Sequence, residues 1–148
     1  MKRIEELKPF SREHHHSLLL SWKIRAGFSK GVEVERIKKY TDWFFPKYIE
    51  SHFREEEAYI FPILGEENPM VKKALSQHRR LEKLFKDSKN PEKSLSLAEE
   101  ELEKHIRFEE RKLFMEIQEI ATPEELEHID KMHDKQKFQE NTEDEFWK

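Results

Sequence analysis

The chain has 148 residues, of which 41% are charged and 35% hydrophobic, so we expect one domain with a narrow apolar core under a polar surface. The 28 basic and 32 acidic residues are interspersed and no apolar run could span a membrane or serve as a signal peptide, so we expect neither a nucleic-acid nor a membrane partner. Because there is no apolar span or signal peptide, we expect a soluble, cytoplasmic protein. Because there is no cysteine, any metal must be held by His, Asp or Glu.

Few glycines and prolines, with abundant Glu, Lys and Leu, favour an all-α fold. The first helix is expected over residues 12–26, after an N-cap at Ser11 and before a stop at Gly27. The second is expected over about 33–64. We expect Pro46 to kink or divide it, because proline removes one backbone hydrogen bond and crowds the preceding turn.

Two further long helices are expected in the second half of the chain. The third should run over about residues 70–86, until Asn90 and Pro91 separate it from the fourth, at about 94–120. Four long helices joined by short loops predict an up-down-up-down four-helix bundle over about residues 11–120. We treat residues 1–148 as a single domain.

The C-terminal part of the chain predicts one short additional helix. Thr122 opens a capping box with proline at the first helical position, so this helix is expected over about 123–138. The tail, 140–148, is expected to be frayed, although its Phe146 and Trp147 could dock.

One stretch of the chain occurs twice. Each copy reads His-x-x-x-Glu, as His52 with Glu56 and His105 with Glu109. A four-residue step on an α-helix places the two side chains one above the other, so each pair shares a face. The copies match at five positions, namely His52/His105, Arg54/Arg107, Glu56/Glu109, Glu57/Glu110 and Phe61/Phe114.

Both repeated glutamates fall on the apolar seams of their helices, where a charge is costly unless it is paired. The first and third helices add histidines at seam positions. On the third helix this is His78. On the first helix the apolar stripe selects His15, and His14 is the next candidate. All four helices should therefore direct an imidazole into one core.

Four histidines and two carboxylates suit two metal ions better than one. If both carboxylates bridge, each ion receives two imidazoles and two carboxylate oxygens, with positions left for a bridging oxo or hydroxo group and an exogenous ligand. This donor set favours a di-iron pair, with manganese or zinc as alternatives. The candidate ligands are His15, His52, Glu56, His78, His105 and Glu109, with His14 as the alternative on the first helix. We expect Glu82, one turn after His78, to support the site from outside the ligand set.

Other interpretations of the same residues compete with this one. His128 and His133 lie outside the repeat on a charged helix and are expected at the surface. A ferritin-type iron or peroxide oxidase would want Glu-x-x-His, which occurs only off the main seam, at Glu13 with His16 and at Glu125 with His128. In a metal-free interaction module, the buried charges would pair among themselves.

With these residues assembled, the chain resembles the hemerythrin-like, or His/His/Glu cation-binding, family. The resemblance covers the four long helices and rests on four motifs: Glu13-His-His, His52-Phe-x-x-Glu56-Glu, Gln77-His78 and His105-Ile-x-x-Glu109-Glu. It implies a four-helix bundle with a non-haem di-iron centre. It also implies functions that include oxygen carriage, oxygen or iron sensing, nitric oxide handling and the repair of damaged iron-sulfur clusters.

The third helix departs from the oxygen-carrier pattern. Oxygen-carrying members have a second histidine one turn from the first, whereas Ala74 and Glu82 occupy those positions around His78. The resemblance therefore points to the sensor and iron-repair branch. The implied partner is O2, NO or a peroxide; a protein partner, and whether the protein is an enzyme, stay open.

Overall fold

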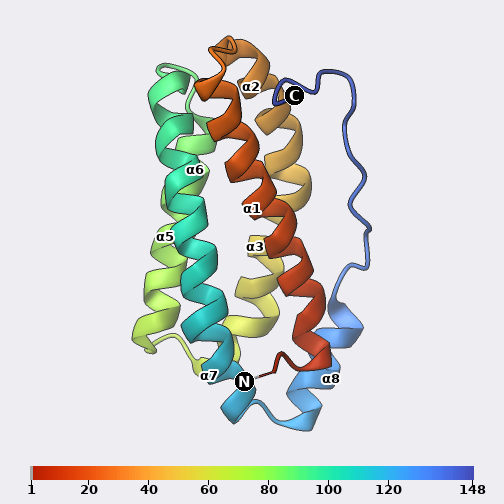
Figure 1. Ribbon diagram of the computed structural model, residues 1–148. Helices are drawn as coiled ribbons and strands as arrows, with labels where there is room; N and C mark the ends of the chain where they lie inside the picture. The colour runs from red at the N-terminus through yellow and green to blue at the C-terminus, as the bar shows by residue number, and fades with distance from the viewer. Residues whose placement is uncertain (1) are drawn as a thin grey trace.

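The computed structural model describes residues 2–148, and within that range every regular element is helical (Figure 1). Four long helical rods lie side by side, and a short fifth helix packs beside one end of them (Figure 1). The first rod is α1 (Lys8–Ser29), preceded by the short 3-10 turn η1 (Glu5–Leu7). The second rod comprises α2 (Val34–Phe44), η2 (Phe45–Glu50), α3 (Ser51–Glu55), η3 (Glu56–Ile60) and α4 (Phe61–Leu64). The third rod is α5 (Pro69–Lys86). The fourth rod comprises α6 (Pro91–Phe108), η4 (Glu109–Leu113) and α7 (Phe114–Ile120). The short fifth helix is α8 (Pro123–Met132).

The second rod does not break at Pro46. Instead α2 passes into η2, a π-helical turn that contains the proline, and the helix continues through it. A π-helical turn shifts the backbone hydrogen bonds from four to five residues apart, so the helix continues past Pro46, which has no N–H to donate. Two more π-helical turns, η3 and η4, begin at Glu56 and at Glu109. Both copies of the repeat therefore enter a widened turn at their glutamate.

The first helix is longer than its sequence signals predict. It begins before Ser11, whose hydroxyl donates to the Glu110 carboxylate instead of capping the helix. It also continues through Gly27. A Cβ at Gly27 would lie 2.9 Å from the ring of Phe146, so this glycine makes room for packing and does not end the helix. Tertiary contacts thus override both local signals.

The C-terminal segment differs most from expectation. The capping box at Thr122 is confirmed, but α8 ends at Met132, before residue 138. Residues 133–148, which we call the strap, return along the outside of the bundle as an extended chain (Figure 1). The end of the strap is not frayed, because Phe146 is only 2% and Trp147 only 8% exposed.

The core consists of two apolar clusters with a polar layer between them. One cluster includes Leu20, Phe53, Leu81 and Ile106, and the other includes Phe10, Ile60, Ala74 and Leu113. Along every rod the chain passes from one cluster to the other, and the two His-x-x-x-Glu pairs, with His14 and His78, lie at the boundary between the clusters. The two clusters fix the height at which the polar side chains meet.

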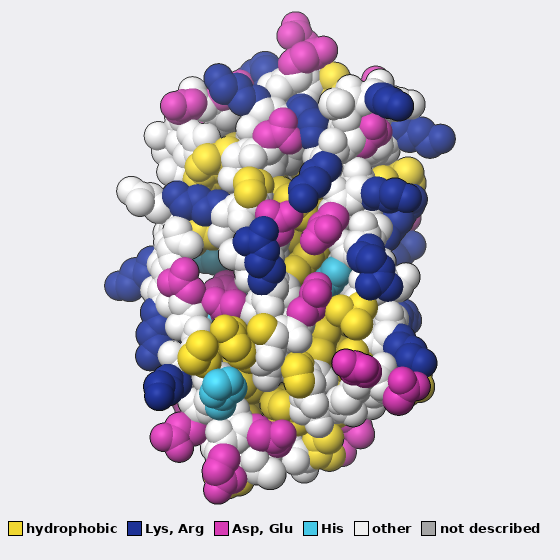
Figure 2. Space-filling model, turned by 180° about the vertical axis from the view of Figure 1, so that it is seen from behind, with side chains coloured by type: hydrophobic (Ala, Val, Ile, Leu, Met, Phe, Trp, Pro, Cys, Tyr) yellow, Lys and Arg dark blue, Asp and Glu magenta, His cyan; other side chains and the backbone are white. Residues whose placement is uncertain are grey.

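The surface is mixed in charge. Figure 2 shows lysine, arginine and acidic side chains alternating over the back of the molecule, with apolar groups scattered among them. Among residues 2–148, no helix is both long and apolar enough to cross a bilayer.

Candidate metal centre

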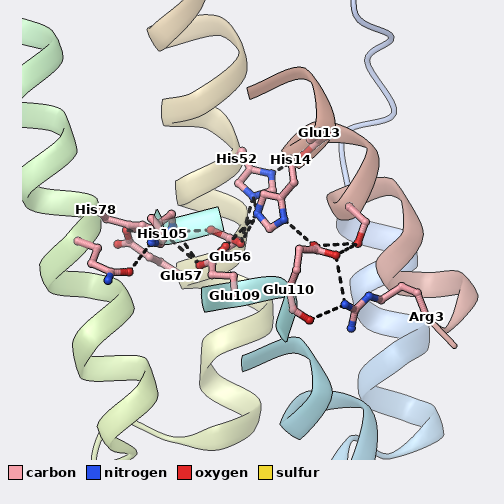
Figure 3. Close-up of polar contacts among 12 residues, drawn as sticks. Arg3, Glu13, His14, His52, Glu56, Glu57, His78, His105, Glu109 and Glu110 are labelled. Carbon is pink, nitrogen blue, oxygen red and sulfur yellow. Dashed lines mark hydrogen bonds and ion pairs between the residues drawn. The ribbon is translucent and has the colours of Figure 1, made fainter. Parts of the chain in front are cut away.

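Six buried side chains from the four rods meet in the polar layer (Figure 3). Four are histidines, one from each rod, and two are the glutamates that open the π-helical turns η3 and η4. They are His14 from α1, His52 from α3, Glu56 from η3, His78 from α5, His105 from α6 and Glu109 from η4.

The six residues form two groups that could each hold a cation. His14 and His52 make one group with the two glutamates, and His78 and His105 make the other with the same two glutamates. Within each group, one ligand atom from every residue lies within 4.8 Å of the others. The site thus has two halves that share Glu56 and Glu109.

Each shared glutamate turns one oxygen toward each half. Oε2 of Glu56 lies 3.1 Å from Nε2 of His52, and its Oε1 lies 3.1 Å from Nε2 of His78. Oε1 of Glu109 lies 2.9 Å from Nε2 of His14, and its Oε2 lies 3.3 Å from Nε2 of His105. This is the arrangement that two bridging carboxylates need.

Several atoms at the centre of this layer lie close to an oppositely charged group but have no hydrogen bond of good geometry within residues 2–148. They are both carboxylate oxygens of Glu56, Oε2 of Glu109, and Nε2 of His78 and of His105. A buried polar atom without a partner destabilises a fold by about 1–3 kcal/mol, and more when it is charged. Two cations between the glutamates would give these atoms partners, so the residues present fit a pair of metal ions.

The outward-facing nitrogen of every histidine is also engaged (Figure 3). Each Nδ1 lies 2.6 or 2.7 Å from a side-chain oxygen, which fixes the ring and favours the tautomer that carries its proton on Nδ1. Nε2 then presents its lone pair to the centre. The pairs are His14 with Glu110, His52 with Glu13, His78 with Glu57, and His105 with Gln77.

These outer partners follow the internal repeat. Glu57 and Glu110 occupy the same position in the two copies, and each binds a histidine on another rod. Glu13 and Gln77 each precede a site histidine directly, and each binds the histidine of one His-x-x-x-Glu copy. Sequence reasoning placed these four residues in the repeat or in the family motifs but did not identify them as hydrogen-bonding partners of the site histidines, because the contacts join different rods.

Without a cation, the site side chains pair with one another. Burial by itself lowers the pKa of His52, but the carboxylates of Glu56 and Glu13 outweigh it and raise the pKa to about 9. Burial raises the pKa of Glu109, but His105 and other hydrogen-bonding neighbours hold it well below its usual value. Because metal ligands must be neutral imidazoles and ionised carboxylates, cation binding has to release protons here.

The structure does not bring every predicted residue to the centre. His15 is exposed, and His14 takes the place on α1 for which His15 was preferred. The stripe that favoured His15 faces partly outward, as its Trp22 is 50% exposed. Glu82 is half-buried on α5 and lies outside both groups of ligands.

The two histidines expected at the surface differ from each other. His128 is exposed, as predicted. His133 is buried, because it packs into the bundle against Phe10 and lies 2.5 Å from the Glu55 carboxylate. The surface prediction was therefore wrong for His133.

The fold and this layer together define a class: an all-helical protein with a buried histidine and glutamate site suited to cations. A family model, the hemerythrin HHE cation binding domain, matches residues 7–114, which is well over half of the chain. The chain therefore belongs to the hemerythrin HHE cation-binding family. Comparisons with curated proteins and with solved structures gave no match.

Proposed function

We propose that this protein is a non-haem di-iron protein that binds or senses O2 or NO, handles a peroxide, or maintains iron centres. The observation that carries the proposal is the placement of Glu56 and Glu109, each of which offers one oxygen to each half of the site. Such sharing is what a pair of closely spaced cations requires and what a single-ion site does not.

Each residue has a distinct task in this proposal. His14 and His52 would hold one ion, His78 and His105 would hold the other, and Glu56 and Glu109, which belong to both groups of ligands, would supply oxygens to both ions. The outer partners keep each imidazole oriented with its Nε2 lone pair toward the centre. Bound iron would supply a redox-active pair with open coordination positions for a small ligand.

Iron is favoured by the donor set and its surroundings. Two imidazoles and two carboxylate oxygens for each ion leave positions open, unlike the closed tetrahedral geometry of structural zinc. Beyond the bridging pair, three further carboxylates, those of Glu13, Glu57 and Glu110, lie against the histidines. This excess of negative charge favours more than one cation and helps the site tolerate the higher charge of ferric iron.

The scaffold we propose for this site is a four-helix bundle in up-down-up-down order. The connections between successive rods, residues 30–33, 65–68 and 87–90, contain four residues each. Connections this short favour antiparallel neighbours. We also keep the expectation of a cytoplasmic protein as part of the proposal.

Anaerobic reconstitution with ferrous iron tests the proposal. We expect close to two irons per chain and, after oxidation, near-ultraviolet absorption typical of a coupled ferric pair. Chelation should lower the melting temperature, because cation binding energy is folding energy in such a site. A wild-type protein that takes up no iron would exclude the proposal and leave the metal-free module.

The ligand is tested on the reconstituted ferrous protein. NO, O2 and hydrogen peroxide are added in separate experiments. The absorption spectrum should change on addition of the ligand that the protein binds. Sustained turnover of added iron or peroxide would instead favour the ferritin-type oxidase. A spectrum that none of the three alters would remove the small-ligand part of the proposal while leaving the metal site intact.

A further inference from the structure

The strap begins with a contact to the outer edge of the metal centre. Nδ1 of His133 lies 2.5 Å from Oε2 of Glu55, and the backbone N–H of Asp134 donates to Oε1 of the same glutamate at 2.9 Å. Nε2 of His133 lies 3.4 Å from Oε2 of Glu13. The first two residues of the strap are thus held by acidic side chains from the first and second rods.

Glu13 joins the strap to a proposed metal ligand. Its Oε1 lies 2.6 Å from Nδ1 of His52, while its Oε2 faces His133. One carboxylate therefore bridges two histidines, one in the site and one in the strap. A chain of polar contacts runs from the site through Glu13 to residue 133.

This connection distinguishes His52 from the other three site histidines. The outer partner of His14, Glu110, is held by Ser11 and Arg3 from the N-terminal part of the chain. The outer partner of His78, Glu57, has a side chain that is 42% exposed, and the outer partner of His105 is the neutral Gln77. Among residues 2–148, the polar contacts that lead outward from the four site histidines reach the strap only through Glu13, on the side of His52.

Beyond residue 134 the strap is docked along most of its length. Phe138 stacks on His16 with ring centroids 4.3 Å apart, and the backbone N–H of Gln139 donates to the Tyr48 hydroxyl at 3.0 Å. Further along, Glu140 forms an ion pair with Lys23 of α1 and accepts a hydrogen bond from Tyr40 of α2. Asp144 forms an ion pair with Arg36 of α2, and the Phe146 ring lies against Gly27 of α1. A segment with this many specific partners has a defined docked state.

The strap also forms one wall of a cleft. The cleft has a volume of about 780 Å³, and its lining includes Glu13, His52 and residues 133–138. Movement of the strap would therefore change the access of solvent to the Glu13–His52 pair.

We propose that His133 is a positioning residue for the ion held by His14 and His52, and that through it strap docking and cation binding stabilise each other. The inference rests on the proposed metal binding and adds that the position of the strap is coupled to it. Nδ1 of His52 lies against Oε1 of Glu13 while Oε2 of Glu13 faces His133. An ion held by Nε2 of His52 would require the proton of the neutral ring to stay on Nδ1, and would therefore favour this same arrangement. Because coupling is reciprocal, the factor by which the cation favours docking equals the factor by which docking favours the cation.

The test measures both sides of this coupling in the full-length protein. Amide hydrogen exchange over residues 134–140 is compared between metal-free and ferrous wild-type protein, and we expect slower exchange when iron is bound. Anaerobic ferrous titration then compares wild type with His133→Ala. We expect one of the two binding steps to weaken by about 10-fold, the lower end of what outer partners of metal ligands contribute, and the other step to be unchanged.

His128→Ala is the matched control, because His128 is an exposed histidine that precedes the strap and lies outside both ligand groups. It should bind both irons as wild type does. Glu55→Gln serves as a second variant in case His133→Ala does not fold, and it should weaken the same step. The coupling would be overturned if either folded variant bound both irons normally and iron left the amide hydrogen exchange of residues 134–140 unchanged. A wild-type protein without iron would overturn the proposed function itself, so the two failures are distinguishable.

Discussion

The Nε2 atoms of His14 and His52 lie 3.0 Å apart, although the two residues belong to different rods. Each ring turns its Nδ1 to a carboxylate oxygen 2.6 Å away, so in the neutral form both Nε2 lone pairs face each other. Two lone pairs at this distance repel unless a proton or a cation lies between them. This geometry suits one half of the proposed cation site, where an ion would take the place of a proton between the two nitrogens.

The first prediction uses the adjacent histidines of α1. His14→Ala removes one imidazole from this half, so we expect ferrous reconstitution to give about one iron per chain in place of two. His15→Ala should retain both irons, because His15 is exposed and lies outside the ligand groups. Metal analysis after gel filtration measures both variants. Equal iron contents in the two variants would contradict the assignment of His14.

The second prediction concerns the shared glutamates. Glu56→Ala and Glu109→Ala each remove an oxygen from both halves, so each variant should lose at least one iron and bind the remaining ion more weakly. Glu82→Ala serves as the control, since Glu82 lies outside both groups and both irons should stay bound. Ferrous titration followed by metal analysis gives the comparison. Full iron content in either shared-glutamate variant would rule out bridging by that residue.

The long helices and the repeated His-x-x-x-Glu pairs could be predicted because helical spacing is local. The expected bounds of the second, third and fourth helices agree with the structure to within three residues. The spacing that puts a histidine and a glutamate on one face of a helix needs no knowledge of the partner helices. Burial of an unpaired carboxylate on an apolar helix face is energetically costly, and this cost indicated that a metal ion pairs with the two glutamates.

The rest depends on contacts between distant residues. On α1 apolar side chains occur on more than one face, so periodicity alone could not choose His14 over His15. The sequence signals at Ser11 and Gly27 were outweighed by Glu110 and Phe146, which lie about a hundred residues further along the chain. The π-helical turns change the hydrogen-bonding register of a helix without changing its apolar pattern, so they too were invisible.

The third prediction concerns the pH dependence of the metal-free protein. The pKa of His52 is raised from 6.5 to about 9, and those of His14 and His78 are raised well above their usual value. A raised folded-state pKa stabilises the fold fully below the unfolded value and loses that contribution as pH rises through the folded value. The free energy of unfolding should therefore fall between pH 7 and 9, and His52 alone should contribute on the order of 2 kcal/mol to this fall.

Urea unfolding of chelated protein across this range measures the effect. The iron-loaded protein is the control, because bound cations keep the imidazoles neutral at every pH in the range. The free energy of unfolding of the iron-loaded protein should not fall between pH 7 and 9 as it does in the metal-free protein. A metal-free protein that grows more stable from pH 7 to 9 would contradict the pairing of these histidines with the site carboxylates.

The fourth prediction concerns the end of the strap. Alanine in place of a mid-helix glycine ordinarily stabilises a helix by about 1 kcal/mol. At Gly27 the new Cβ would lie 2.9 Å from the Phe146 ring and 3.0 Å from Ile37, so Gly27→Ala should instead destabilise the protein by about 1–3 kcal/mol. Phe146→Ala removes the ring, so in that background Gly27→Ala should be much less harmful. Urea unfolding of the two single variants and the double variant gives the coupling free energy, and simple additivity would show that Phe146 is not docked on Gly27 in solution.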